Sequence, residues 1–237
     1  MTWIRRRRLV KKRRTFTGLT LVAAISFIAG MADAVGLMLC GDFVSFMTGN
    51  TTQAALAFAG GDYSHAIILF GALWVFIFGN AAGIVLAHSL SARRSFVVLT
   101  AVATILAVAA LLPDSSHARV QFYLIVFGMG MINATVEHIE GLPIGLTYVT
   151  GALSRFGRGI GRWLMGDRNP AGWIIQTVPW TGMACGAVSG AFLANYAGDR
   201  ALWAVSGLSL AVALATALLP RPLHLHFQQP IHRGRRA

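Results

Sequence analysis

The sequence predicts an all-α polytopic membrane protein whose six transmembrane helices form two inverted three-helix repeats. Composition, apolar run length and an internal repeat carry this prediction. Of 237 residues, 56% are hydrophobic and 12% are charged, whereas a soluble domain averages about 25% charged residues. Six apolar runs approach the ~20 residues that cross the hydrocarbon core of a bilayer. They cover residues 19–40, 66–87, 96–112, 120–136, 173–197 and 201–219.

Short motifs recur in the same order along the two halves of the chain. GMADA is matched by GMINA, SFMTG by TYVTG, GNAAGIVLA by GAVSGAFLA, Arg93 by Arg200, and ALLP by a second ALLP. Ordered matches of this kind indicate an internal repeat. We therefore divide the chain into a first three-helix repeat over residues 16–113 and a second over 117–220, flanked by basic cytoplasmic tails at 1–15 and 221–237.

Three spans per half reverse the second half relative to the first, as in many transporters and channels. With a cytoplasmic N-terminus, the loop holding Arg93 and Arg94, the arginines between 155 and 168, and the C-terminus all fall inside. This distribution agrees with the positive-inside rule. The alternative treats the TG motifs as full crossings, with four spans per half in parallel, and would place Arg93 and Arg94 outside.

The net charge of +12 is concentrated at the termini, above all in RRRRLVKKRR at residues 5–14. Basic runs beside apolar helices are topology signals that stay in the cytoplasm and contact anionic lipid. We therefore expect membrane lipid as a partner and no nucleic acid. The following helix resembles an export signal, but GMADA recurs at 130–134 as GMINA, where no signal peptide could lie. We expect it to remain as the first span.

The segment FVSFMTGNTTQ, residues 43–53, places polar side chains among apolar helices. We expect Gly49 to turn the chain and Asn50 or Thr51 to cap a following helix. Residues 41–62 would then leave and re-enter the same membrane face, or form a broken helix. A helix N-terminus inside the protein attracts anionic or dipolar groups. In the alternative interpretation, the hydroxyls only satisfy the broken backbone.

Asp33 is an acid inside the first span, where a charge costs roughly 2.5–3.5 kcal/mol. It either relays a proton or cation, or hydrogen-bonds the TG backbone; both interpretations stay open. Near the end of the equivalent helix, Glu137, His138 and Glu140 are interpreted as solvated residues. The candidate substrate-binding residues are Asp33, Thr48, Gly49, Asn50, Thr51, Asn133, Thr150 and Gly151.

Small residues recur every four positions, at Gly182, Gly186, Gly190 and Ala194, and again at Gly79, Gly83 and Ala87. This pattern predicts close helix packing rather than a binding site. Cys40 and Cys185 are interpreted as small buried thiols. No catalytic or metal-binding motif is present, so we expect neither enzymatic activity nor a cofactor.

The segments GMADAVGLMLCGDFVSFMTGNTT and GMGMINATVEHIEGLPIGLTYVTGALSRFG resemble the YoaK-like family of bacterial inner-membrane proteins, a family of unknown function. The resemblance covers about residues 16–220 and implies an integral protein of the bacterial cell envelope, without a substrate. Glu137 and His138 stand where the family would have basic residues. The basic N-terminal run is an elaboration.

The function expected from these observations is transport or channelling of a small anionic or dipolar solute across the bacterial cytoplasmic membrane, with proton coupling through Asp33. The alternative is a membrane scaffold or assembly partner that transports nothing. Oligomerisation with further copies of the chain stays open.

Overall fold

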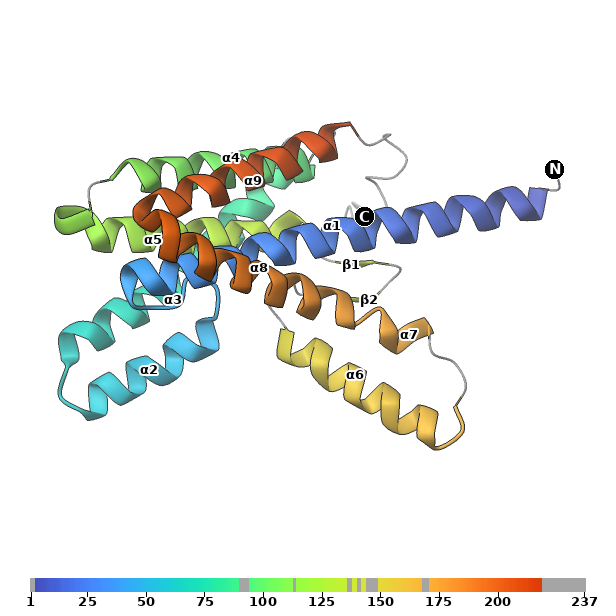
Figure 1. Cartoon of the computed structure of the whole chain (residues 1–237), viewed down its shortest axis with the longest axis horizontal. Coiled ribbons are helices and arrows are strands. Elements are labelled where there is room, and N and C mark those ends of the chain that lie inside the picture. The colour runs from blue at the N-terminus through green and yellow to red at the C-terminus, as the bar shows by residue number, and fades with distance from the viewer. Residues whose placement is uncertain are drawn as a thin grey trace, which may run out of the picture.

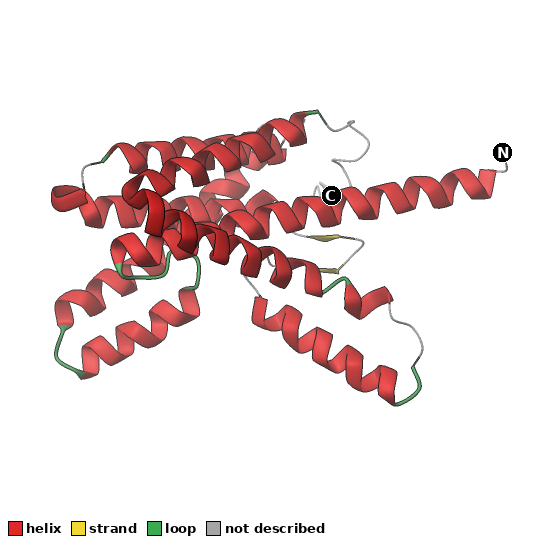
Figure 2. Ribbon diagram, in the orientation of Figure 1, coloured by secondary structure: helices red, strands yellow, loops and turns green. Residues whose placement is uncertain are grey.

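The computed structural model describes residues 3–89, 94–112, 114–135, 138–139, 142–143, 149–167 and 171–218, and these are almost entirely helical (Figure 2). The α-helices are α1 Trp3–Cys40, α2 Met47–Ala59, α3 Tyr63–Ser89, α4 Arg94–Leu111, α5 Asp114–Ile132, α6 Val149–Leu164, α7 Ala171–Ile174, α8 Thr177–Ala197 and α9 Ala201–Ala217. Short 3₁₀ turns follow α5 (η1, Asn133–Thr135) and α8 (η2, Gly198–Arg200). Two-residue strands, β1 His138–Ile139 and β2 Leu142–Pro143, pair antiparallel. The predicted helical class is confirmed.

Four stretches of the described chain are long and apolar enough to cross a membrane: Thr15–Cys40, Tyr63–His88, Arg94–Leu111 and Thr177–Ala217. The last contains two helices, α8 and α9, because the chain reverses direction at η2 (Figure 1). The basic run at residues 5–14 is helical, since α1 begins at Trp3 and continues through it into the first span.

The predicted glycine packing is confirmed along α1 and α8. A Cβ at Gly182 would lie 2.7 Å from the Ala23 carbonyl oxygen, and one at Gly190 would lie 2.6 Å from that of Met31. At Gly186 a Cβ would collide with the carbonyl of Phe27. Only glycine allows two helix backbones to approach this closely.

The same packing recurs between α3 and α5, at equivalent positions of the repeat. Gly79 meets the carbonyl of Phe127 as Gly186 meets that of Phe27. Gly130 meets Phe76 and Asn80, as Gly30 meets Met183 and Ala187. The first long helix of each half therefore packs on the second long helix of the other half, α1 on α8 and α5 on α3, so neither half forms a separate bundle.

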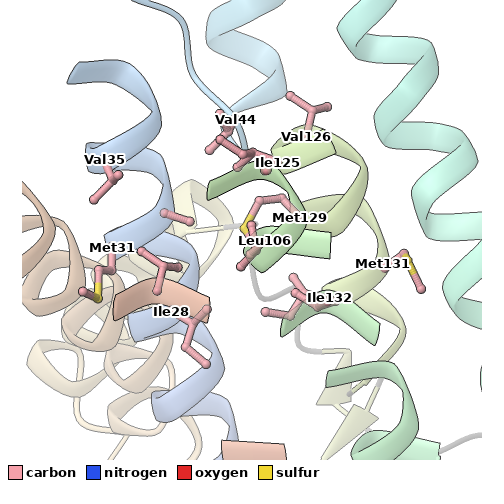
Figure 3. Packing of buried hydrophobic residues seen from close by; sticks show 14 of the residues in the cluster. Ile28, Met31, Val35, Val44, Leu106, Ile125, Val126, Met129, Met131 and Ile132 are labelled. Atoms are coloured by element: carbon pink, nitrogen blue, oxygen red, sulfur yellow. The ribbon is translucent and has the colours of Figure 1, made fainter. Parts of the chain in front are cut away.

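Helices α4 and α9, which close the two halves, pack against each other, and Ser206 Oγ on α9 donates to the Ala103 carbonyl at 2.7 Å. Apolar side chains fill the space between α1, α4 and α5. Figure 3 shows Ile28, Met31 and Val35 of α1, Leu106 of α4 and a row from α5 as members of one buried apolar cluster. The α5 residues are Ile125, Met129 and Ile132, each fully buried.

The two helices that contain the TG motifs diverge. Both begin near the middle of the molecule; α2 runs to one end and α6 to the other, the end where α1 also begins (Figure 1). Helix α2 packs along α3, whereas α6 packs against α7 and α8. The expectation of two buried thiols is wrong for Cys185, which is exposed on α8, while Cys40 is partly buried and neither forms a disulfide.

Candidate functional site

Asp33 lies in the last turns of α1 and is only 7% exposed. Its Oδ1 accepts the backbone N–H groups of Val44 at 2.9 Å and of Ser45 at 2.8 Å. Gly36, one turn further along α1, lets the Val44 side chain press against the helix. The carboxylate therefore fixes the loop that connects α1 to α2, in agreement with one of the two interpretations left open for Asp33.

Asn50, in the first turn of α2, is fully buried and donates from Nδ2 to the Phe43 carbonyl at 2.6 Å. That carbonyl and the Val44 N–H belong to one peptide group, and no described peptide bond is cis. In a planar trans peptide the C=O and N–H point in opposite directions. Asp33 and Asn50 therefore hold the 43–44 peptide from its two edges, in an arrangement that we call the peptide clamp.

The clamp leaves side-chain oxygens unused. Asn50 Oδ1 and Gln53 Oε1 are buried and accept no hydrogen bond from any described residue. A buried unpaired acceptor costs about 1–3 kcal/mol, so native proteins rarely keep one without a reason. These oxygens lie one helical turn apart on α2 and are available to a donor from water or a solute.

The expected turn at Gly49 and caps at Asn50 or Thr51 are wrong. Helix α2 already begins at Met47, and its N-cap, Phe46, makes no side-chain hydrogen bond. The turn occurs instead at Gly41, whose φ of 81° favours glycine. Thr51 Oγ1 donates to the Met47 carbonyl at 2.8 Å, within the helix. The break comes early because Asp33 already satisfies the backbone donors ahead of α2.

Two further predicted site residues of this segment lie outside the clamp. Thr48 is exposed, and its carbonyl accepts the Thr52 hydroxyl at 3.2 Å. Gly49 lies inside the helix beneath the ring of Phe46, where a Cβ would collide. The Phe46 and Phe43 rings meet edge to face at 5.3 Å. Glycine is therefore needed here for packing against an aromatic ring rather than for a turn.

The second half repeats the helix start, while the segment just ahead of it, residues 144–148, lies outside the described residues. Helix α6 begins at Val149, one residue before Thr150 and Gly151, as α2 begins one residue before Thr48 and Gly49. Thr150 is exposed, and Gly151 lies beside the Arg155 guanidinium. Asn133 donates to the Met129 carbonyl at 3.2 Å, four residues back. Arg93, Glu137, Glu140 and Arg168 lie outside the described residues, and His138 lies in β1.

Two polar pairs of the structure were not predicted. Asp42 Oδ1 lies 3.3 Å from His65 Nε2; burial raises the pKa of Asp42 and the charge of His65 opposes that shift. Arg155 Nε donates to Gln176 Oε1 at 2.9 Å. Each pair joins residues about twenty positions apart, a distance at which sequence spacing carries no signal.

A groove of about 480 Å³ lies elsewhere, between α1, α8 and α9. Its lining is mostly apolar, and none of the predicted site residues contributes to it. The lining residues are Thr20, Ala23, Ala24, Phe27, Thr181, Gly182, Cys185, Leu208 and Val212. The groove and the peptide clamp are therefore separate features.

Comparison with known proteins places the chain in a family. The family described as "Protein of unknown function (DUF1275)" matches residues 21–215. The chain is 52% identical over 229 residues to the UPF0700 transmembrane protein RA0705 of Rhizobium meliloti (strain 1021), covering 97% of this chain and 99% of that protein. No solved structure matches. The resemblance to YoaK is confirmed, because YoaK is a member of the same family. The chain is thus a membrane-embedded protein that belongs to the DUF1275 family of transmembrane proteins of uncharacterised function.

Proposed function

We propose that this chain is a small-solute transporter or channel of the bacterial cytoplasmic membrane, built from two inverted three-span repeats. With α5 counted as a span and α8 and α9 counted separately, the chain crosses six times. The divergence of α2 and α6 toward opposite ends of the molecule supports the inversion (Figure 1). The start of α1 and the end of α9 lie toward one end, which we assign to the cytoplasm because it carries the basic run.

The observation that carries the proposal is the exchange of helices between the halves. The pairs α1–α8 and α3–α5 are each packed backbone to backbone through glycine, which makes each pair a rigid body. Packed interfaces of this kind shift between discrete arrangements rather than deforming continuously. Rocking of one pair against the other, about α4 and α9, would expose the region between them to alternate sides of the membrane.

The peptide clamp supplies the place where a proton or solute acts. An ionised Asp33 accepts strong, charge-assisted bonds from Val44 and Ser45. Protonation weakens those bonds and frees the loop ahead of α2. Asn50 Oδ1, buried and unpaired among the described residues, then offers an acceptor to the solute. The solute is a small anion or dipole that also carries a donor group.

The test screens purified protein for thermal stabilisation by small anions, carboxylates and zwitterions. A ligand found in this way should bind Asn50→Ala about tenfold more weakly, because about 1 kcal/mol is lost with one polar contact. Asp33→Asn should keep the fold and remove the pH dependence of binding. Thr48→Ala is the matched control, because that side chain is exposed beside the site. Unchanged binding by both site variants would place the solute elsewhere.

A membrane scaffold remains the second candidate, and a specific observation favours it. Asp33 and Asn50 are 7% and 0% exposed, and both use hydrogen bonds to hold the loop. A purely structural clamp needs nothing more. Absence of any stabilising solute, together with unfolding of Asp33→Asn, would support the scaffold.

A further inference from the structure

Helix α6 separates charged and apolar side chains onto opposite faces. Arg155, Arg158 and Arg162 are spaced three and four residues apart, which places them on one face. Leu153, Ile160 and Leu164 are spaced seven and four apart and lie on the opposite face. The equivalent helix α2 contains no charged residue, so this separation belongs to α6 and not to the repeat.

Only a narrow strip of α6 packs against the rest of the protein. Ala152 and Gly159 are buried, and the Trp173 side chain fills the space beside Gly159. The Trp173 ring lies 5.4 Å from that of Phe156. The apolar face stays open: Leu153 is 42% exposed, Ile160 38% and Leu164 72%. A contiguous exposed apolar face marks a contact with a membrane or a partner.

The arginine face has only neutral partners among the described residues. Arg155 donates to the amide oxygen of Gln176 at 2.9 Å, and Arg158 donates to the Ser154 hydroxyl at 3.1 Å. Within the described part of the chain, no ion pair links Arg155, Arg158 or Arg162 to a carboxylate. The guanidinium groups of Arg158 and Arg162 are exposed and suited to bidentate contact with phosphate.

We infer that α6 lies in the interface of the cytoplasmic leaflet and binds anionic phospholipid, with its apolar face among acyl chains and its arginines at the headgroups. A membrane interface satisfies both faces at once, whereas a dissolved anion would leave the apolar face in water. Trp163, 45% exposed near the end of α6, is an aromatic anchor typical of such interfaces. The helix runs toward the end of the molecule where the basic run of α1 begins (Figure 1). This contact does not depend on the transport of a solute.

The first test compares thermal stability in nanodiscs of phosphatidylcholine alone and with added phosphatidylglycerol. The anionic lipid should raise the melting temperature of the wild type, and Arg158→Gln with Arg162→Gln should lose at least half of that rise. Arg155 is left intact because its bond to Gln176 supports the fold. The control variant carries Arg119→Gln and Arg200→Gln; both arginines are exposed, and they lie at the start of α5 and in η2, at the opposite end of the bundle (Figure 1). An equal rise in the wild type and the α6 variant would overturn the inference.

Two further measurements distinguish a lipid contact from the binding of a dissolved anion. Inorganic phosphate added to phosphatidylcholine nanodiscs should not reproduce the stabilisation; if it does, α6 binds a dissolved anion and the lipid contact is wrong. A nitroxide at Ile160→Cys, in a background with serine at Cys40 and Cys185, should relax with oxygen more than with an aqueous nickel chelate. Leu164→Cys serves if the first variant does not fold. Preferential relaxation by nickel would show that the apolar face lies outside the bilayer.

Discussion

Helices α2 and α6 begin in the same way and are held in different ways. Each starts one residue before a Thr-Gly pair and near the middle of the molecule. Helix α2 is uncharged, and the loop ahead of it is fixed by Asp33 of α1 through the peptide clamp. Helix α6 carries three arginines and is attached through Trp173 and Gln176, which lie just before α8.

The shared Thr-Gly motif thus specifies where each helix starts, whereas the surrounding residues specify how each helix is held in place. An acid on α1 holds the entry to α2 with two backbone hydrogen bonds, while the equivalent Asn133 is a neutral amide that donates to the Met129 carbonyl. Among the described residues, the clamp is seen in the first half. In the other half, an aromatic contact holds α6, and the arginines of that helix stay on the surface, where lipid can reach them. Three predictions test what the two halves share and where they differ.

The greatest loss of stability is expected from substituting a glycine in the close helix packing, a feature that both halves share. Gly186→Leu would force a side chain into the carbonyl of Phe27, and a helix backbone cannot yield as a side chain can. We expect a loss of about 3 kcal/mol or more, seen as a loss of monodisperse protein on size-exclusion chromatography. Gly207→Leu on α9 is the matched control, because a Cβ there meets nothing within 4 Å. Normal yield of Gly186→Leu would show that α1 and α8 do not pack as described.

A second, smaller loss of stability is expected to differ between the two halves. Asp33→Ala leaves the N–H groups of Val44 and Ser45 unpaired, at about 1–3 kcal/mol for each buried donor. Asn133→Ala removes a neutral side chain that donates to the Met129 carbonyl, and we expect a smaller loss because hydrogen bonds between neutral groups are weaker than those to a carboxylate. Thermal unfolding in the same detergent compares the two. Equal losses would mean that Asn133 holds its loop as firmly as Asp33 does, and the asymmetry would disappear.

The smallest expected effect is the pH dependence of stability that arises from Asp42, which faces His65 near the α2–α3 turn. Burial raises the pKa of Asp42, so the folded state binds its proton more tightly than the unfolded state does. Stability should therefore fall as pH rises from below the usual aspartate pKa to above the raised one. Asp42→Asn has no such proton, and its stability should change less over this acid range, by under about 1 kcal/mol. A steeper fall of stability with pH in Asp42→Asn than in the wild type would contradict the raised pKa of Asp42.

Local signals in the sequence were enough to predict the membrane class and the glycine contacts, and they also indicate an internal repeat. These signals are the length of an apolar run, the order of short motifs, and a four-residue spacing that returns on one helix face. The sequence also marked Asp33 and Asn50, because an acid and an amide among apolar residues require partners. It placed the turn wrongly at Gly49, since glycine favours both turns and close packing, and a sequence does not distinguish these uses.

The choice of partners, in contrast, depends on tertiary packing. The clamp joins a carboxylate, a peptide and an amide over seventeen residues, and the α1–α8 pair joins a helix of the first half to a helix of the second. The arginine spacing of α6 is legible in the sequence, but the exposure of its apolar face follows from Trp173 filling only the strip beside Gly159. Long-range partners of this kind are selected by the packing of the whole bundle, because no local interaction favours one distant residue over another.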